Sequence, residues 1–233
     1  MSSHISSHPS SFKCLDVVAS FFVGILIVSN IASSAKIVDM GISLFSIQLV
    51  FDGGTLLFPL VYVLGDVLTE VYGFKTARRV IWTGFTAMIM AVLVFFLLGI
   101  LPGELFWEAE AGSKAYNDIL GGMSYGGIVL ASLCAYLAGE FSNAKILSKL
   151  KVLMKGRKLW VRTIGSSLVG EFLDTIIFVL IASITGVFSW EIFWPLVITN
   201  YILKCSIEAI MTPFTYWASR FLKTKEGIDI YDS

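Results

Sequence analysis

The sequence predicts an all-α membrane protein with six transmembrane helices and with both termini in the cytoplasm. Three observations lead to this prediction. Of the 233 residues, 56% are hydrophobic and 15% are charged, and the mean hydropathy is +0.82, which is unusual for a soluble domain. Apolar runs long enough to cross a bilayer recur along the chain. Lys and Arg gather on alternate sides of these runs, as in the cytoplasmic loops of membrane proteins.

Six apolar segments account for the predicted spans, and short polar stretches connect them. The segments cover residues 15–33, 55–73, 79–101, 124–144, 160–187 and 193–219. The first is too long for a signal-peptide core and is expected to be retained. The segments define a six-helix transmembrane domain at 15–220, with a disordered, Ser-rich tail at 1–14 before it and a cytoplasmic tail at 221–233 after it.

The loop at 36–54 has a different pattern from the other connections. Every second residue of 47–51 is Ile, Leu or Phe, and Asp52-Gly53-Gly54 then supplies turn-forming residues. This alternation predicts a short hairpin or lid in the first outer loop. A plain loop is the alternative interpretation.

The distribution of basic residues predicts the orientation. One side of the spans carries 14 of the 17 Lys and Arg residues, seven of them within 145–162, whereas the other side carries only Lys36 and Lys114. Lys204 lies inside a span and completes the count. Because basic residues are enriched in cytoplasmic loops, both termini are expected in the cytoplasm.

Ionisable residues interrupt the apolar helices near the middle of the membrane. At a helical rise of about 1.5 Å per residue, four of them lie roughly 16–21 Å from one end of their spans: Asp66, Glu171, Asp174 and Lys204. A hydrocarbon core about 30 Å thick places all four near its midplane. Ionisable residues at this depth normally face a bundle interior or a wet cavity. Three carboxylates face one lysine, so at least one acid must be protonated, solvated or paired with a ligand.

Helical spacing predicts which polar residues share a face. Tyr62, Asp66 and Glu70 share one face, Glu171 and Asp174 a second, and Asn200, Lys204 and Glu208 a third. A structural ion pair of Lys204 with Asp66 or Asp174 is one interpretation. The other, which we favour, is a substrate cavity formed by Asn30, Asp66, Glu171, Asp174, Asn200 and Lys204.

A second group of charged residues lies nearer the cytoplasm. Glu70, Glu140 and Glu208 are within plausible reach of the basic residues Arg78, Arg79 and Arg162. Structural ion pairs between these groups are expected, with a role in coupling as the alternative.

Composition excludes several other functions. The net charge is zero, so no nucleic-acid partner is expected. The two histidines lie in the N-terminal tail and the three cysteines have no metal-ligand spacing, so neither a metal site nor a cofactor is expected. No nucleophile–base pair appears, so no catalytic residues are predicted and an enzyme is disfavoured. The chain has no phosphate-binding loop, so any ATP would be hydrolysed by another protein.

Three stretches of the chain resemble the queuosine precursor transporters, membrane proteins of the vitamin uptake transporter type. They are YVLGDVLTEVYGFKTARRVIW, KLWVRTIGSSLVGEFLDTIIFVLIAS and NYILKCSIEAI. The resemblance implies a multi-pass protein of a bacterial or archaeal plasma membrane that imports 7-cyano-7-deazaguanine and 7-aminomethyl-7-deazaguanine. The family-like polar positions are Asn30, Asp66, Glu70, Arg78, Arg79, Glu171, Asp174 and Lys204.

Deazaguanine chemistry suits the predicted cavity. Two adjacent donors on the base, the N1–H and the exocyclic amino group, match the two oxygens of one carboxylate. The base carbonyl requires a donor such as Lys204, and its flat ring requires apolar or aromatic walls such as Tyr62 and Phe178. The expected partners are therefore this small molecule and the lipid bilayer, with a homo-oligomer also compatible. A substrate-binding subunit that depends on a separate energising module is the alternative function.

Overall fold

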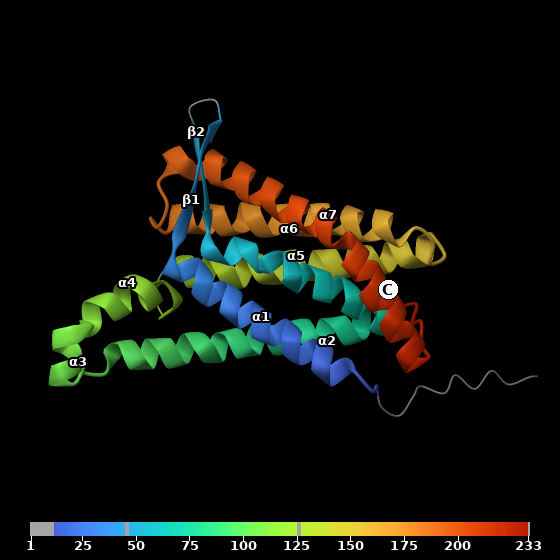
Figure 1. The fold of residues 1–233 in the computed structure, drawn as a ribbon, viewed down its shortest axis with the longest axis horizontal. Coiled ribbons are helices and arrows are strands. Elements are labelled where there is room, and N and C mark those ends of the chain that lie inside the picture. Colours follow the sequence, from blue (N-terminus) through green and yellow to red (C-terminus); the bar gives the residue numbers. More distant parts are fainter. Residues whose placement is uncertain (1–11, 45–46, 125–126, 233) are drawn as a thin grey trace, which may run out of the picture.

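The computed structural model describes residues 12–44, 47–124 and 127–232, which form a bundle of long helices (Figure 1). The main helices are α1 (Leu15–Ala35), α2 (Phe58–Ile100), α5 (Gly127–Leu153), α6 (Leu159–Ile184) and α7 (Phe193–Glu226). The shorter elements are β1 (Ile37–Leu44), β2 (Ile47–Asp52), the 3-10 turns η1 (Gly53–Leu56) and η2 (Trp190–Ile192), α3 (Leu105–Glu110) and α4 (Gly112–Ser124). The predicted helical class is confirmed.

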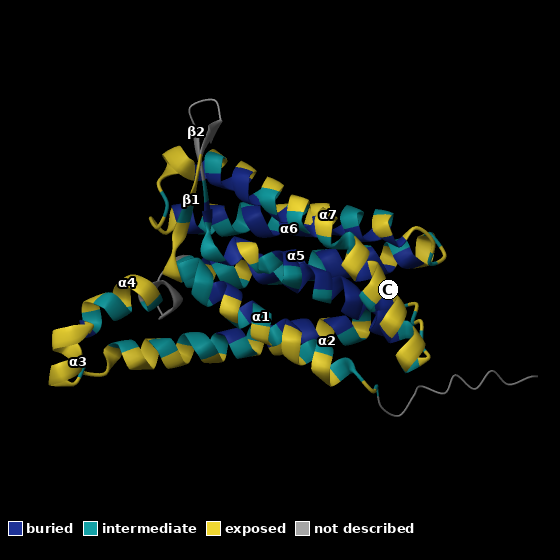
Figure 2. Cartoon of the chain, in the orientation of Figure 1, coloured by how far each residue is buried: buried dark blue, intermediate teal, exposed yellow. Residues whose placement is uncertain are grey.

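The bundle has an apolar exterior, and its interior combines a hydrophobic core with many buried polar residues. α1, α2 and α6 are long and apolar enough to cross a membrane. In α7, Lys204 and Glu208 are buried, whereas Ile202 and Ile210 are more than half exposed. Figure 2 shows the buried residues on the faces that the central helices turn towards one another. Such a distribution is expected when lipid rather than water surrounds the helices.

α2 is a helical hairpin rather than a single rod. Gly73 interrupts the helix with a φ of 79°, a conformation that glycine adopts readily because it has no Cβ. A straight helix would separate Gly65 from Gly84 by about 28 Å, yet a side chain at either position would contact Phe22. Figure 1 shows the two halves running in opposite directions from this bend. The predicted second and third segments are therefore antiparallel helices with almost no loop between them.

The loop at 36–54 contains the hairpin that its alternating pattern predicted. β1 and β2 pair in antiparallel fashion, with Ile37 opposite Asp52. The Asp52-Gly53-Gly54 sequence, expected to supply a turn, forms the start of the 3-10 turn η1, with Asp52 at its N-cap. The carboxylate of Asp52 accepts hydrogen bonds from the backbone N–H of Gly54 at 3.0 Å and from the Thr55 hydroxyl at 2.8 Å. Asp52 thus caps the segment that leads into α2.

Several boundaries differ from the sequence prediction. α5 continues to Leu153, and α7 continues to Glu226 rather than ending before 221. Hydropathy marks where apolar residues stop, whereas a helix continues as long as its backbone hydrogen bonds do. Of the predicted tail at 1–14, residues 1–11 lie outside the described residues. Phe12 packs against Tyr72 with ring centroids 5.1 Å apart, so the end of this tail is part of the fold.

Two glycines allow α5 and α6 to cross closely. A Cβ at Gly139 would lie 3.1 Å from the Gly170 carbonyl oxygen, and a Cβ at Gly170 would lie 3.0 Å from that of Gly139. Small residues permit such close approach of helix backbones in membranes. Tyr62 of α2 lies against both glycines. This crossing brings the polar residues of α2, α5 and α6 into one interior.

Candidate functional site

A buried ion pair joins α6 to α7 in the interior of the bundle. Lys204 Nζ lies 2.5 Å from Asp174 Oδ2, and the two side chains are only 7% and 11% exposed. Helical spacing places Lys204 and Asn200 on one face of α7, and in the structure this face is turned towards Asp174 of α6. Of the two partners considered for Lys204 from the sequence, the structure has Asp174 and not Asp66.

A small cavity surrounds this ion pair. Phe58 and Phe178 contribute aromatic walls, and Lys204 Nζ lies 5.2 Å from the centroid of the Phe58 ring, within the range of a cation–π interaction. Polar groups complete the lining: Ser33, Asp52, Ser132, Thr175 and Asn200. The volume is about 20 Å³, which is room for about one water molecule. The cavity is therefore closed around the ion pair in this conformation.

Asp52 is a cavity residue that the sequence analysis missed. Besides capping η1, its carboxylate accepts a hydrogen bond from the Ser33 hydroxyl of α1. Thr55, which donates to the same carboxylate, lies 3.4 Å from the amide oxygen of Asn200 in α7. The end of the hairpin thereby connects α1, η1 and α7. The only sequence signal was an acid directly before two glycines at the start of an apolar span.

Asn30 lies in a neighbouring cavity. Its amide nitrogen donates to the Leu26 carbonyl at 2.8 Å, and its amide oxygen accepts from the Ser132 hydroxyl. Ser33, Ser132 and Phe178 line both cavities. Through Ser132, Asn30 is therefore linked to the lining of the cavity that surrounds the Asp174–Lys204 pair.

Asp66 and Tyr62 lie outside the lining of the Lys204 cavity. Asp66 Oδ1 accepts a hydrogen bond of 2.9 Å from the Asn143 amide, whose oxygen in turn accepts from the Ser167 hydroxyl at 3.3 Å. The Tyr62 hydroxyl has no hydrogen-bond partner among the described residues. The sequence analysis did not assign Asn143 or Ser167 to the site, because spacing within one helix says nothing about which helix lies opposite.

Glu140, Glu171 and Glu208 are buried acids without a hydrogen-bond partner in the described part of the chain. Glu171 and Glu208 line a small cavity between α6 and α7, and Glu140 packs against Gly65 of α2. The ion pairs expected for Glu140 and Glu208 are therefore not found. The reason is geometric, because two of their expected partners, Arg78 and Arg79, are exposed on the outside of α2.

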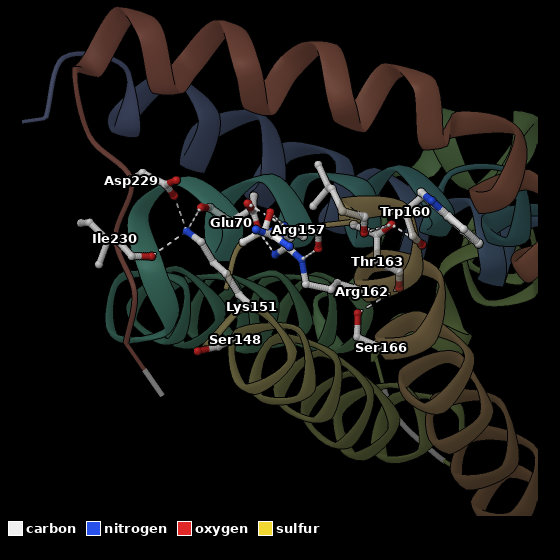
Figure 3. Close-up of polar contacts among 12 residues, drawn as sticks. Glu70, Ser148, Lys151, Arg157, Trp160, Arg162, Thr163, Ser166, Asp229 and Ile230 are labelled. Atoms are coloured by element: carbon white, nitrogen blue, oxygen red, sulfur yellow. Dashed lines mark hydrogen bonds and ion pairs between the residues drawn. The ribbon is translucent and has the colours of Figure 1, made fainter. Parts of the chain in front are cut away.

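Glu70 does form an ion pair of the expected kind. The Arg162 guanidinium contacts both oxygens of Glu70, with Nη2 at 3.2 Å from Oε1, and both residues are 1% exposed. Lys223 of α7 lies 2.6 Å from the same carboxylate. Figure 3 shows Glu70 and Arg162 facing each other between their helices. Glu70, Arg162 and Lys223 thus form a cluster that connects α2, α6 and α7.

Lys151 extends this cluster to the C-terminal tail. Its ammonium group donates to the Glu70 carbonyl at 2.6 Å, to Asp229 at 2.5 Å and to the Ile230 carbonyl at 2.7 Å (Figure 3). Partial burial raises the pKa of Asp229, but its bonds to Lys151 and Lys223 outweigh this and lower it. Asp229 is therefore ionised at neutral pH. Sequence analysis missed this contact, because Lys151 was counted as a residue of a basic loop.

Comparison with known sequences identifies the family. The sequence profile of the family described as "Putative vitamin uptake transporter" matches residues 52–218. The chain belongs to this family. The matched segment of this vitamin uptake transporter contains α2, α5 and α6, most of α7, and with them Asp174, Lys204 and Asp66. The family resemblance described from the sequence is confirmed.

Curated relatives of this family member carry transporter names. The "Probable queuosine precursor transporter" of Bacillus subtilis (strain 168) is 27% identical over 174 residues, which are 74% of this chain and 73% of that protein. The "Queuosine precursor transporter" of Escherichia coli (strain K12) is 24% identical over 179 residues, 77% of this chain and 73% of that protein. No solved structure matches the chain significantly. The protein is thus a multi-pass membrane transporter of the bacterial cell membrane and not an enzyme.

Proposed function

We propose that this transporter imports the deazaguanine precursors of queuosine, 7-cyano-7-deazaguanine and 7-aminomethyl-7-deazaguanine, and binds them at the Asp174–Lys204 pair. The names of its relatives support the substrate class. The observation that carries the binding site is the isolated, buried ion pair with aromatic walls and further polar groups around it. A carboxylate, an ammonium group and flat apolar walls are the groups that a guanine-like base requires.

Each member of the pair matches one part of the base. The Asp174 carboxylate accepts the N1–H and amino donors, and Lys204 or Asn200 donates to the carbonyl oxygen. Phe58 and Phe178 lie on the walls of the same cavity and provide contact surface for the ring. Without substrate, Asp174 and Lys204 neutralise each other, which avoids the cost of an unpaired charge in the membrane.

Substrate entry requires a conformational change. Pockets for small molecules usually have volumes of about 300–1,000 Å³, whereas this cavity has about 20 Å³. α6 must therefore move relative to α7 or α2 to admit a base. A closed site that opens in turn to each side of the membrane is the requirement of alternating access.

The proposed topology has six spans with both termini in the cytoplasm. Two of the spans are the antiparallel halves of α2, and the others are α1, α5, α6 and α7. The asymmetry of Lys and Arg places the Glu70–Arg162 cluster at the cytoplasmic end. The β1–β2 hairpin then lies on the outer side, where Asp52 at its end lines the cavity.

A binding measurement with Asp174→Asn tests the site. Wild-type protein in detergent should bind radiolabelled 7-cyano-7-deazaguanine, and Asp174→Asn should weaken binding more than about tenfold, because an amide presents a donor to a donor of the base. Asp118→Asn makes the same change at an exposed position of α4 and serves as the control. Unchanged affinity of a normally inserted Asp174→Asn protein would exclude Asp174 from the site.

Uptake into liposomes that contain only this protein distinguishes an autonomous importer from a substrate-binding subunit. Accumulation of precursor would establish an autonomous importer. Binding without uptake would instead support a substrate-binding subunit that needs an energising partner.

A further inference from the structure

Next to the Asp174–Lys204 ion pair, α6 and α7 also carry two acids that face each other, Glu171 and Glu208. Glu171 precedes Asp174 by three residues, and Glu208 follows Lys204 by four. Each therefore lies about one turn, or roughly 5 Å, along its helix from the ion pair. Glu171 and Glu208 line the same small cavity between the two helices, together with Ser167 and Cys205.

This second pair is buried and lacks compensation by positive charge. Glu171 is 0% exposed and Glu208 4%, and none of their four carboxylate oxygens has a hydrogen-bond partner among the described residues. The nearest cations are already engaged, Lys204 with Asp174 and Arg162 with Glu70. The other titratable groups that act on the pair are acids or weak acids: Tyr62, Asp66, Asp174, Tyr201 and Cys205, with Glu140 close to Glu171.

Two adjacent ionised carboxylates without a cation are strongly unfavourable inside a membrane protein. A proton shared between the two groups removes one charge and supplies the missing donor. We propose that Glu171 and Glu208 form a proton-binding site, and that an inward-directed proton gradient drives transport through it. The second part of this inference rests on the proposed import function.

The geometry links the proton site to the substrate site. The cavity at Asp174 and Lys204 must widen to admit a base, and α6 and α7 provide most of its polar lining. In the proposed topology Glu171 and Glu208 lie about one turn to the cytoplasmic side of this ion pair, so this end of the α6–α7 interface must open to release substrate into the cytoplasm. A shared proton holds the two carboxyl groups together, whereas two negative charges repel each other. Protonation therefore keeps the inner end of the interface closed, and loss of the proton favours release of substrate, which couples the two movements.

The direction of coupling follows from this linkage. On the outer, proton-rich side, a proton from the medium binds to the pair and keeps the inner end of the α6–α7 interface closed while substrate enters the Asp174–Lys204 cavity from outside. On the inner, proton-poor side, the proton leaves to the cytoplasm, and repulsion between the carboxylates favours opening. One proton and one base move inwards together.

Proteoliposomes with an acidic exterior and a neutral interior test this coupling. Wild-type protein should accumulate 7-cyano-7-deazaguanine, and a protonophore should abolish accumulation. Glu171→Gln and Glu208→Gln should each reduce gradient-driven accumulation about tenfold or more, while exchange of internal for external base without a gradient persists. Glu191→Gln, at an exposed carboxylate of η2, should behave as wild type. Accumulation that ignores the pH gradient, or that survives in both buried variants, would overturn the coupling.

A second measurement tests proton binding without substrate. Infrared spectra of the wild-type protein at neutral pH should contain the C=O stretch of a protonated carboxyl group, and the Glu171→Gln/Glu208→Gln double variant should lose part of that intensity. Identical spectra of the wild-type protein and the double variant would refute the proton site, independently of which substrate the protein transports. Loss of intensity together with absence of any base exchange in wild type would instead leave the proton site standing and refute the proposed import function, and with it the coupling.

Discussion

The Asp232 carboxylate accepts a hydrogen bond of 2.5 Å from the backbone N–H of Phe74, a residue 158 positions earlier in the chain. Its second oxygen accepts from the Lys75 N–H at 3.1 Å. These N–H groups begin the second half of α2, directly after the bend at Gly73. The first N–H groups of a helix have no partner within the helix and attract negative charge. The C-terminal tail therefore caps the reversal between two predicted spans.

Asp232→Ala should lower the free energy of unfolding by about 1 kcal/mol, the usual effect of losing a helix cap. Thermal unfolding of purified protein in detergent measures this as a lower Tm. Asp118→Ala removes an exposed carboxylate within α4 and is the control. If the two variants unfold at the same temperature, the cap does not stabilise the bend.

Arg162→Gln should destabilise the protein, but by less than the value of about 3–5 kcal/mol expected for a fully unpaired buried charge, because Lys223 remains as an ionic partner of Glu70. Arg79→Gln removes the same charge from an exposed position of α2 and should have little effect. The yield of folded protein and its thermal unfolding compare the two variants. Equal stability of both would show that the Glu70–Arg162 pair contributes nothing net to the fold.

Lys204→Met should abolish binding of both the cyano and the aminomethyl precursor, since the two share the guanine edge that Lys204 is proposed to contact. Competition binding with each compound measures the effect. Loss of only the aminomethyl form would argue against recognition of the carbonyl. Near-normal uptake by a Lys204→Met/Asp174→Asn double variant would show that the ion pair is structural and that neither residue binds substrate.

The proposed topology predicts the accessibility of two exposed lysine positions. In a background without Cys14, Cys134 and Cys205, Lys114→Cys in α4 should react with a membrane-impermeant thiol reagent in intact cells. Lys155→Cys, between α5 and α6, should react only after the membrane is opened. Reversed labelling would invert the orientation and place the Glu70–Arg162 cluster outside. It would also reverse the side from which a proton reaches Glu171.

Local patterns in the sequence were sufficient to predict most of the helices and the hairpin. Hydropathy located the segments that became α1, both halves of α2, α5, α6 and α7, and alternation located the β1–β2 hairpin. The spacing of Glu171 and Asp174 placed both on one face of α6, which the structure shows to face α7. These properties depend on neighbours within about one helical turn or along one strand, so the chain alone contains them.

Only the tertiary structure decided which polar residues meet. The sequence allowed Lys204 to pair with Asp66 or Asp174, and the approach of α6 to α7 selects Asp174. The packing of α2 against α5 brings Asn143 to Asp66. Contacts between residues far apart in the chain depend on helix packing and on the bend at Gly73, and no local pattern encodes the partner. The residue types at membrane depth were thus determined by the sequence. The packing of the helices decided their division into the Asp174–Lys204 pair, the facing acids Glu171 and Glu208, and the Glu70–Arg162 cluster.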